Sequence, residues 1–389
     1  MFVLQLALIG LCVALFPLSY VLVKGDAAKF RKLLWVTTFI TLDLVMFGSF
    51  TRLTDSGLGC PDWPGCYGTA SPFVAHHAIR LAEAAMPTGP VTMTKAWIEM
   101  THRYVAMAVG VLIIAQLLIV VLRRRQLRVS WIWPAGLLAL ICVQGAFGAW
   151  TVTLKLQPVI VTIHLLLGLA LLAGLGWFAA SQTPQPACEP ALAPVMRRWR
   201  TAAVAGLCLL IAQIALGGWV STNYAVLACT DFPTCNGQWL PPMDFAQGFH
   251  LWRKLGLAGN GEVITQDALV AIHWTHRTFA VIVIAYLAWL GIRLKRFAAL
   301  RGPARLLLLM TAVQLLSGLS NIVLKWPLLI AVMHNGGAAV MLLCLVMLNY
   351  RIVSDQSGRS DQSGPSAGSG RAGESDPAAG KVTRTAVTL

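Results

Sequence analysis

Hydrophobic residues occur along this chain in long continuous runs, separated by short charged or proline-rich segments. About 20 mostly apolar residues are enough for a helix to cross the hydrocarbon core of a bilayer. The runs of that length predict nine transmembrane helices, over residues 2–23, 33–53, 97–122, 131–153, 158–180, 201–222, 268–292, 304–323 and 328–350. Because lipid offers no hydrogen-bond partners, each span must satisfy its own backbone. We therefore expect one all-α, polytopic membrane bundle and no sheet.

The composition agrees with this interpretation, and the charge pattern orients the chain. Only 12% of the residues are charged and 57% are hydrophobic, whereas about one-quarter of an ordinary soluble domain is charged. The net charge of +15 does not indicate nucleic-acid binding, because basic residues concentrate in every second loop, the pattern of cytoplasmic loops. These groups are Lys24, Lys29, Arg31 and Lys32; Arg123, Arg124, Arg125 and Arg128; Arg197, Arg198 and Arg200; and Arg293, Lys295, Arg296, Arg301 and Arg305. The loops 54–96 and 223–267 then lie outside.

The two ends of the chain differ in character. The first apolar run lacks a basic segment before it and a small-residue cleavage site after it, which favours a retained anchor with its N-terminus outside over a cleaved signal peptide. From residue 354 onward the chain is polar and without apolar periodicity, so a disordered cytoplasmic tail is predicted.

An internal repeat divides the chain. Residues 47–66 align with residues 216–235 without a gap, so that Gly48, Cys60, Asp62, Pro64 and Cys66 meet Gly217, Cys229, Asp231, Pro233 and Cys235. Further matches are His102-Arg103 with His276-Arg277, Gln144 with Gln314, Lys155 with Lys325, and His164 with His334. We predict two tandem four-helix units of the same topology, related by an axis along the membrane normal. The expected divisions are an extra N-terminal helix with its basic loop (1–31), the first unit (32–180), a cytoplasmic linker (181–200), the second unit (201–351) and the tail (352–389).

Four histidines are the leading candidates for chemistry, because ionisable residues inside a membrane are costly. His102 and His164 belong to the first unit, and His276 and His334 are their counterparts. Each pair brings two imidazoles to a similar depth near the outer ends of two helices, which suits axial ligation of a haem iron from both faces. Hydrogen bonding between helices is the structural alternative. Zinc is a weaker option, because no cysteine or carboxylate accompanies each pair.

Charged neighbours accompany two of these histidines. Arg103 and Arg277 each follow a candidate ligand, where a guanidinium can bind a haem propionate or extend to water. Glu99 lies three residues before His102, on the same helical face, and its counterpart is His273. This divergence indicates that one half performs chemistry while the other carries electrons, with Glu99 moving protons or stabilising charge. The alternative is an interfacial acid near a helix N-terminus.

Two cysteine pairs lie in the predicted outer loops, each with five residues between its members. Cys60 with Cys66 and Cys229 with Cys235 can each close a small disulfide in an oxidising compartment. A structural cross-link is favoured over a redox-active pair, because nothing nearby clearly depresses a thiol pKa. The remaining cysteines have no counterpart in the repeat and read as apolar packing residues: Cys12, Cys142, Cys188, Cys208 and Cys344.

From about Lys32 to Arg351 the chain resembles the haem A synthase family of bacteria and mitochondria. The resemblance rests on the stretch TRLTDSGLGCPDWP at residues 51–64, on the element from Glu99 to Arg103, and on the helices of His164 and His334. It implies an eight-helix, two-half bundle in the bacterial inner membrane. The leading helix and the segments around 70–95 and 236–265 are departures from the family pattern.

The resemblance also implies roles for the candidate residues. His276 and His334 would bind a haem b cofactor, and His102 and His164 would hold the substrate haem O. The methyl group at position 8 would be oxidised to a formyl group by successive hydroxylations, with Glu99 at the position of the family's catalytic glutamate. Cys60 with Cys66 and Cys229 with Cys235 would form disulfides. Haem O synthase, an electron donor and further copies of the chain are the expected partners, together with membrane lipid.

Other classes of function remain open from the residues alone. A bis-histidine electron carrier would explain the four histidines, but not the difference between Glu99 and His273. A haem chaperone or transporter and a membrane scaffold are further alternatives. A prenyl transferase is disfavoured, because that chemistry needs magnesium held by Asp-rich motifs and the predicted spans contain none.

Overall fold

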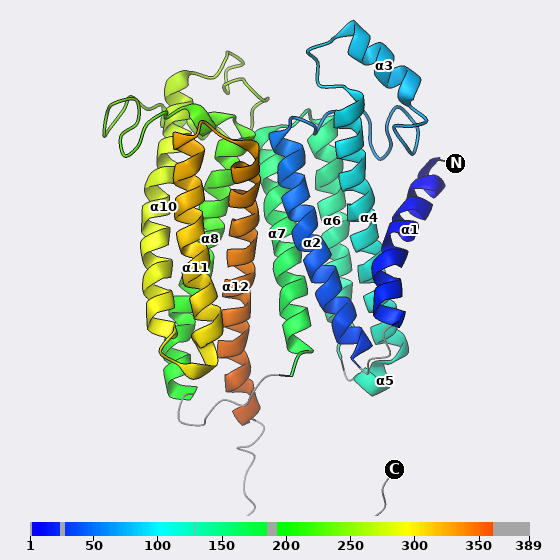
Figure 1. Ribbon diagram of the computed structural model, residues 1–389, viewed down its shortest axis with the longest axis vertical. Coiled ribbons are helices and arrows are strands. Elements are labelled where there is room, and N and C mark those ends of the chain that lie inside the picture. Colours follow the sequence, from blue (N-terminus) through cyan, green and yellow to red (C-terminus); the bar gives the residue numbers. More distant parts are fainter. Residues whose placement is uncertain (1, 24–27, 128, 185–192, 361–389) are drawn as a thin grey trace, which may run out of the picture.

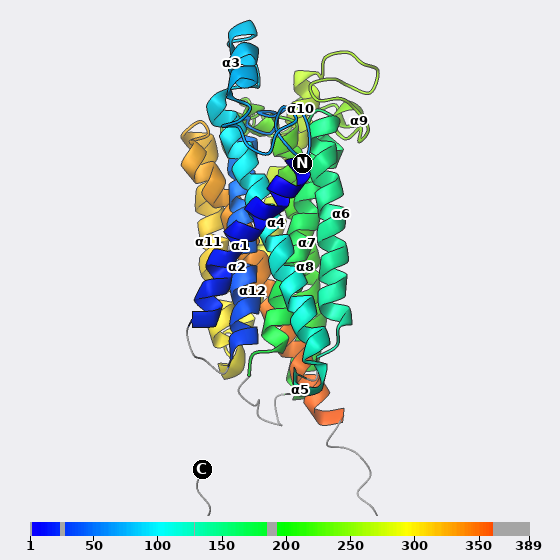
Figure 2. The same cartoon turned by 90° about the vertical axis from the view of Figure 1, so that its right-hand side faces the viewer.

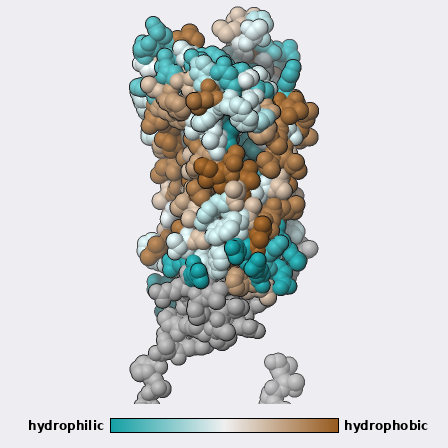
Figure 3. Space-filling model, turned by 90° about the vertical axis from the view of Figure 1, so that its left-hand side faces the viewer, coloured by the Kyte–Doolittle hydropathy of each residue, from teal (hydrophilic) through white to brown (hydrophobic). Residues whose placement is uncertain are grey.

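The computed structural model describes residues 2–23, 28–127, 129–184 and 193–360. Over these residues the chain is all-helical and forms no β-strand, only three isolated β-bridges in loops. Nine helices in the described part are long and apolar enough to cross a membrane. On the face drawn in Figure 3, a largely hydrophobic middle section lies between more polar ends. The prediction of an all-α polytopic membrane protein is confirmed.

The long helices begin and end close to the predicted spans. They are α1 (Phe2–Val23), α2 (Lys29–Leu53), α4 (Met93–Leu122), α6 (Ile132–Thr153), α7 (Pro158–Ser181), α8 (Ala193–Thr222), α10 (Gln266–Leu294), α11 (Arg301–Val323) and α12 (Leu328–Ser360). The loops add α3 (His76–Ala85), α5 (Arg124–Leu127), α9 (Phe245–Gly248) and the 3-10 turns η2 (Ala225–Leu227) and η3 (Ala298–Leu300). Thr92 and Thr265 cap α4 and α10 by accepting hydrogen bonds from Lys95 N and Ala268 N.

Two helices extend beyond the predicted spans, into segments assigned to the tail and to the linker. Helix α12 continues to Ser360, past residue 354, where the polar tail is predicted to begin. Helix α8 begins at Ala193, inside the predicted linker 181–200. Extending an existing helix costs much less than nucleating one, so a membrane helix propagates into polar residues beyond the bilayer. Residues 185–192 with Cys188, the segment 361–389, Lys24 and Arg128 lie outside the described residues.

The helices pack as two rings of four. In one ring α2 contacts α4 and α7, and α6 closes the ring by contacting the same two helices. In the other ring α8 contacts α10 and α12, and α11 contacts the same two. Figure 1 shows the rings side by side. They meet where α2 and α7 pack against α12 and where α7 packs against α8, while α1 lies outside against α4 and α2.

Local features recur at matched positions of the two rings. The peptide bonds Trp63-Pro64 and Phe232-Pro233 are both cis. Left-handed backbone occurs at four pairs of aligned residues: Asp55 and Tyr224, Tyr67 and Asn236, Lys155 and Lys325, and Leu156 and Trp326. These features support the predicted repeat. The division of the chain into two equivalent units stays a prediction.

Polar contacts join the rings near the ends of α2 and α8. Arg52 Nη2 donates to Ser221 O over 2.7 Å, and its guanidinium lies 4.1 Å from the centroid of the Tyr224 ring. The Tyr224 hydroxyl donates to Asp55 Oδ1 over 2.6 Å. Arg52 aligns with Ser221 and Asp55 with Tyr224, so each residue meets its own counterpart across the seam, an arrangement compatible with the predicted axis between the two units.

The two ends of the bundle differ in their loops. The long segments after α2 and after α8, with α3 and α9, lie at one end together with the start of α1 (Figures 1 and 2). Helix α5, the loop between α10 and α11, and the end of α12 lie at the opposite end, where the described basic residues concentrate. We call these the loop end and the basic end.

Candidate functional site

The four histidines lie on diagonally opposite helices of the two rings. His102 is on α4 and His164 on α7, and these helices alternate with α2 and α6 around their ring. His276 on α10 and His334 on α12 have the same arrangement with α8 and α11. All four lie toward the loop end of their helices. The imidazoles of each pair are near enough to interact electrostatically.

Each imidazole faces a glycine on a neighbouring helix. A Cβ atom added to Gly48 would lie 3.0 Å from His102 Nε2, and one added to Gly217 would lie 2.9 Å from His276 Cε1. At Gly148 the same atom would lie 3.2 Å from His164 Cε1, and at Gly318 it would lie 3.3 Å from His334 Cε1. Any larger residue would push the ring aside. Glycine on the alternate helices therefore makes room for the imidazoles.

These residues fit a bis-imidazole haem site in each ring. A bis-imidazole haem takes one ligand on each face, and diagonal helices present two imidazoles across the centre of a four-helix bundle. Among the described residues, no group of three or more His, Cys, Asp or Glu side chains is placed to hold a metal ion. The structure thus brings together His102 with His164 and His276 with His334. Haem ligation by them stays a prediction.

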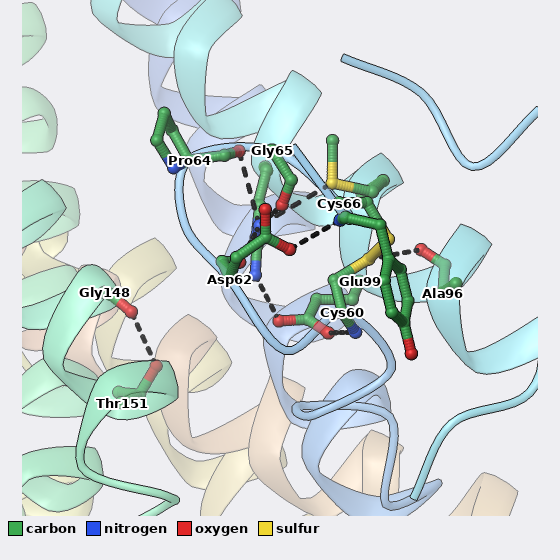
Figure 4. Close-up of polar contacts among 12 residues, drawn as sticks. Cys60, Asp62, Pro64, Gly65, Cys66, Ala96, Glu99, Gly148 and Thr151 are labelled. Atoms are coloured by element: carbon green, nitrogen blue, oxygen red, sulfur yellow. Dashed lines mark hydrogen bonds and ion pairs between the residues drawn. A yellow bond between two sulfur atoms is a disulfide. The ribbon is translucent and has the colours of Figure 1, made fainter. Parts of the chain in front are cut away.

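Glu99 is buried and turned toward the loop after α2. Its Oε2 accepts a hydrogen bond from the backbone N–H of Cys60 over 2.8 Å, and its Oε1 lies 2.6 Å from Arg103 Nη2 (Figure 4). Only 4% of the residue is exposed. Glu99 is therefore not the interfacial acid of the alternative interpretation but part of a buried ion pair that anchors a loop, one helical turn from His102.

His273 makes the corresponding contact in the other ring. Its Nδ1 accepts a hydrogen bond from the backbone N–H of Cys229 over 3.2 Å, and 4% of the residue is exposed. Both residues therefore hold the first cysteine of a loop, although one is a carboxylate and the other an imidazole. The loop contact itself does not require a negative charge.

The two arginines bind the same loops. Arg103 Nη1 donates to Asp62 O over 3.0 Å and to Gly65 O over 2.5 Å. Arg277 Nη2 donates to Thr234 O over 3.0 Å, and its Nη1 is buried without a partner. Sequence reasoning did not foresee these loop contacts. A propionate contact stays a prediction for both arginines, and Arg277 has the free donor for it.

A disulfide closes each loop, between Cys60 and Cys66 and between Cys229 and Cys235. In the first loop Asp62 accepts hydrogen bonds from the backbone N–H groups of Tyr67 and Gly68, over 2.6 and 2.7 Å. A structural role for both disulfides, rather than electron exchange, stays a prediction.

An aspartate organises the second loop in the same way. Asp231 accepts hydrogen bonds from the Thr234 hydroxyl and from the backbone N–H groups of Asn236 and Gly237. These bonds, that from Thr234 foremost, lower the pKa of Asp231 below its ordinary value of 3.8. The charged carboxylate is therefore the form that holds this loop.

Sequence reasoning missed two polar residues beside the histidines of the second ring. Ser317 Oγ lies 2.8 Å from His334 Nδ1, and Gln213 Nε2 lies 3.1 Å from His276 Nδ1. Polar residues inside apolar spans were the available signal. The contacts themselves depend on how α8 packs against α10 and α11 against α12, and could not be read from spacing.

Comparison with known proteins agrees with this arrangement. Residues 31–346 match a family described as cytochrome oxidase assembly protein. A haem A synthase of Shewanella oneidensis is 38% identical over 333 residues, covering 84% of this chain and 98% of the relative. One from Caulobacter vibrioides is 28% identical over 342 residues, covering 82% of this chain and 94% of the relative. From the family match over residues 31–346 and the 38% identity to the Shewanella oneidensis protein, we conclude that the chain belongs to the haem A synthase family.

Proposed function

We propose that this protein is a haem A synthase, an oxidoreductase that converts the methyl group at position 8 of haem O to a formyl group through successive hydroxylations. The observation that carries the proposal is that each ring has two histidines on diagonally opposite helices, and that each imidazole faces a glycine on one of the other two helices. The naming of the relatives as haem A synthases supports the substrate. An electron carrier that modifies nothing would not explain why only one ring has a carboxylate at the Glu99 position.

The two rings have different tasks in this proposal. His276 and His334 hold haem b, which supplies one-electron redox chemistry to the reaction. His102 on α4 and His164 on α7 would bind the substrate haem O. The buried Glu99 next to Arg103 takes up and releases protons beside the substrate. The retention of a carboxylate there supports this role, because His273 shows that the loop contact needs none.

The orientation in the membrane follows from the two ends of the bundle. We place the protein in the inner membrane of a bacterium with the loop end outside, because disulfides form in oxidising compartments. The basic end then faces the cytoplasm. The N-terminus lies outside and the C-terminus inside. Haem O synthase and an electron donor are the expected partners, and further copies of the chain are a third candidate.

Product analysis tests the proposed reaction. The chain is expressed in a host that lacks its own haem A synthase and makes haem O. The pigments are then extracted, separated and identified by mass spectrometry. Haem A is expected with the wild-type chain and not with the His102→Ala variant. Recovery of haem O alone from cells that contain folded wild-type protein would reject the reaction.

A further inference from the structure

The surroundings of His334 and His164 differ although their helices match. Gln314 and Gln144 donate to the backbone carbonyls of His334 and His164, each over 3.0 Å, so the two sites share this contact. Three residues after Gln314 comes Ser317, whose Oγ lies 2.8 Å from His334 Nδ1. Three residues after Gln144 comes Phe147, and His164 Nδ1 is buried without a partner.

The same contrast occurs at the other two histidines. Gln213, four residues before Gly217, contacts both the ring and the backbone of His276, with Nε2 3.1 Å from Nδ1 and 3.2 Å from the carbonyl oxygen. Four residues before Gly48 the chain has Leu44. The ring of His102 stacks on Phe47 at 6.4 Å, and no hydrogen bond to it occurs within the described part of the chain. In the first ring Gln144 Nε2 does reach His164 Nε2, over 3.5 Å, but no polar group reaches Nδ1 of either histidine among the described residues. Both histidines of the second ring thus have a polar partner at Nδ1 that the first ring lacks.

These polar partners have the chemistry that a haem-ligating histidine needs. When one ring nitrogen binds iron, an acceptor for the N–H of the other nitrogen fixes the orientation of the imidazole and makes it a stronger donor. The Ser317 hydroxyl points to Gln314 O at 3.3 Å, which leaves its oxygen to accept from His334 Nδ1–H. Gln213 Oε1 is buried without a partner. A half-turn of that amide places Oε1 against His276 Nδ1, in exchange for the hydrogen bond that Nε2 now donates to His276 O.

We propose that Ser317 and Gln213 are positioning residues that make the second ring retain its haem, and that Phe147 and Leu44 make the first ring a site of exchange. The inference rests on the proposed function, in which both rings bind haem. It also answers a requirement of that function, since an enzyme whose cofactor and substrate are both porphyrins must keep one and release the other. The four residues make that distinction without any change of iron ligand.

Transfer of haem to excess apomyoglobin measures retention in the purified, haem-loaded protein. Ser317→Ala and Gln213→Leu are expected to weaken haem retention in the second ring by roughly 10–100-fold, the usual effect of removing a hydrogen-bond partner from a metal-bound histidine. The midpoint potential of that haem is expected to rise, because the imidazole becomes a weaker donor. Ser317→Thr, which keeps the hydroxyl, restores both values.

A matched control lies on the same helix. Ser320 on α11 donates only to Leu316 O, so Ser320→Ala removes a serine hydroxyl without touching a histidine and should leave haem retention and potential unchanged. The reverse variant Phe147→Ser supplies His164 with an acceptor and should slow the release of haem from the first ring. Wild-type retention and potential in both Ser317→Ala and Gln213→Leu would overturn the inference while leaving the proposed function standing. A wild-type protein that takes up no haem would overturn both.

Discussion

Glu99 and His273 occupy matched places beside two disulfide loops, and each accepts a hydrogen bond from the backbone N–H of the first cysteine of its loop. The contact is the same while the chemistry differs, because a carboxylate in one ring is an imidazole in the other. Comparing the two residues shows which property of Glu99 the loop contact needs and which property only a reaction would need. The loop requires only an acceptor.

Glu99→His therefore tests the catalytic role while sparing the loop. The variant imitates His273, so we expect the loop and the haem b spectrum to be preserved. Formation of haem A should fall by roughly 10²–10⁴-fold, the usual contribution of a positioned acid or base. Pigment analysis of membranes with equal amounts of protein measures this. Haem A at the wild-type level would remove Glu99 from the chemistry.

The arginines should differ in their contribution to stability. Arg103→Ala leaves the buried Glu99 carboxylate without its cation, since only 10% and 5% of the two side chains are exposed. Breaking such a pair costs about 3–5 kcal/mol. Arg277→Ala removes hydrogen bonds to the loop but no ion pair among the described residues, and should cost less. Thermal unfolding in detergent compares the two, and equal losses would argue against the buried ion pair.

We expect the disulfide between Cys60 and Cys66 to stabilise the fold and to take no part in the oxidation of haem O. It joins residues six positions apart, and closing so short a loop stabilises the folded chain by about 2 kcal/mol. The double variant Cys60→Ser, Cys66→Ser should lose that stability and still produce haem A. Unfolding curves and pigment yield are measured on the same preparation. A stable variant without haem A would instead indicate a redox-active pair.

Acid should loosen the second loop. The pKa of Asp231 is lowered in the folded loop, so its stabilising effect is fully present above the ordinary value of 3.8 and is lost as the pH falls through the lower folded value. Hydrogen exchange at the Asn236 and Gly237 amides should become faster, relative to its intrinsic rate, below that pH. In Asp231→Asn the protection should be weaker at neutral pH and no longer fall with acid. Protection in the wild type that does not change with pH would contradict this role.

The sequence predicted those features that depend on one helix alone, and not those that depend on contacts between elements. The nine spans were predicted from the length of apolar runs, and the histidine pairs were found because an imidazole inside lipid is costly. The partners of Arg103 and Ser317 were not foreseen, because a loop folding back on its helix or the crossing of two helices sets such contacts. The end of α12 was missed because helix propagation past the membrane leaves no apolar signal.

Optical spectra of the purified protein test the central claim that paired imidazoles bind haem. The wild-type chain, isolated in detergent from cells with ample haem, is expected to show a Soret band and a reduced spectrum typical of bis-histidine haem b. His276→Ala and His334→Ala should each abolish the haem b signal, while the control Ser320→Ala should retain it. A folded wild-type protein without Soret absorption, or His276→Ala and His334→Ala spectra identical to that of the wild type, would contradict the account.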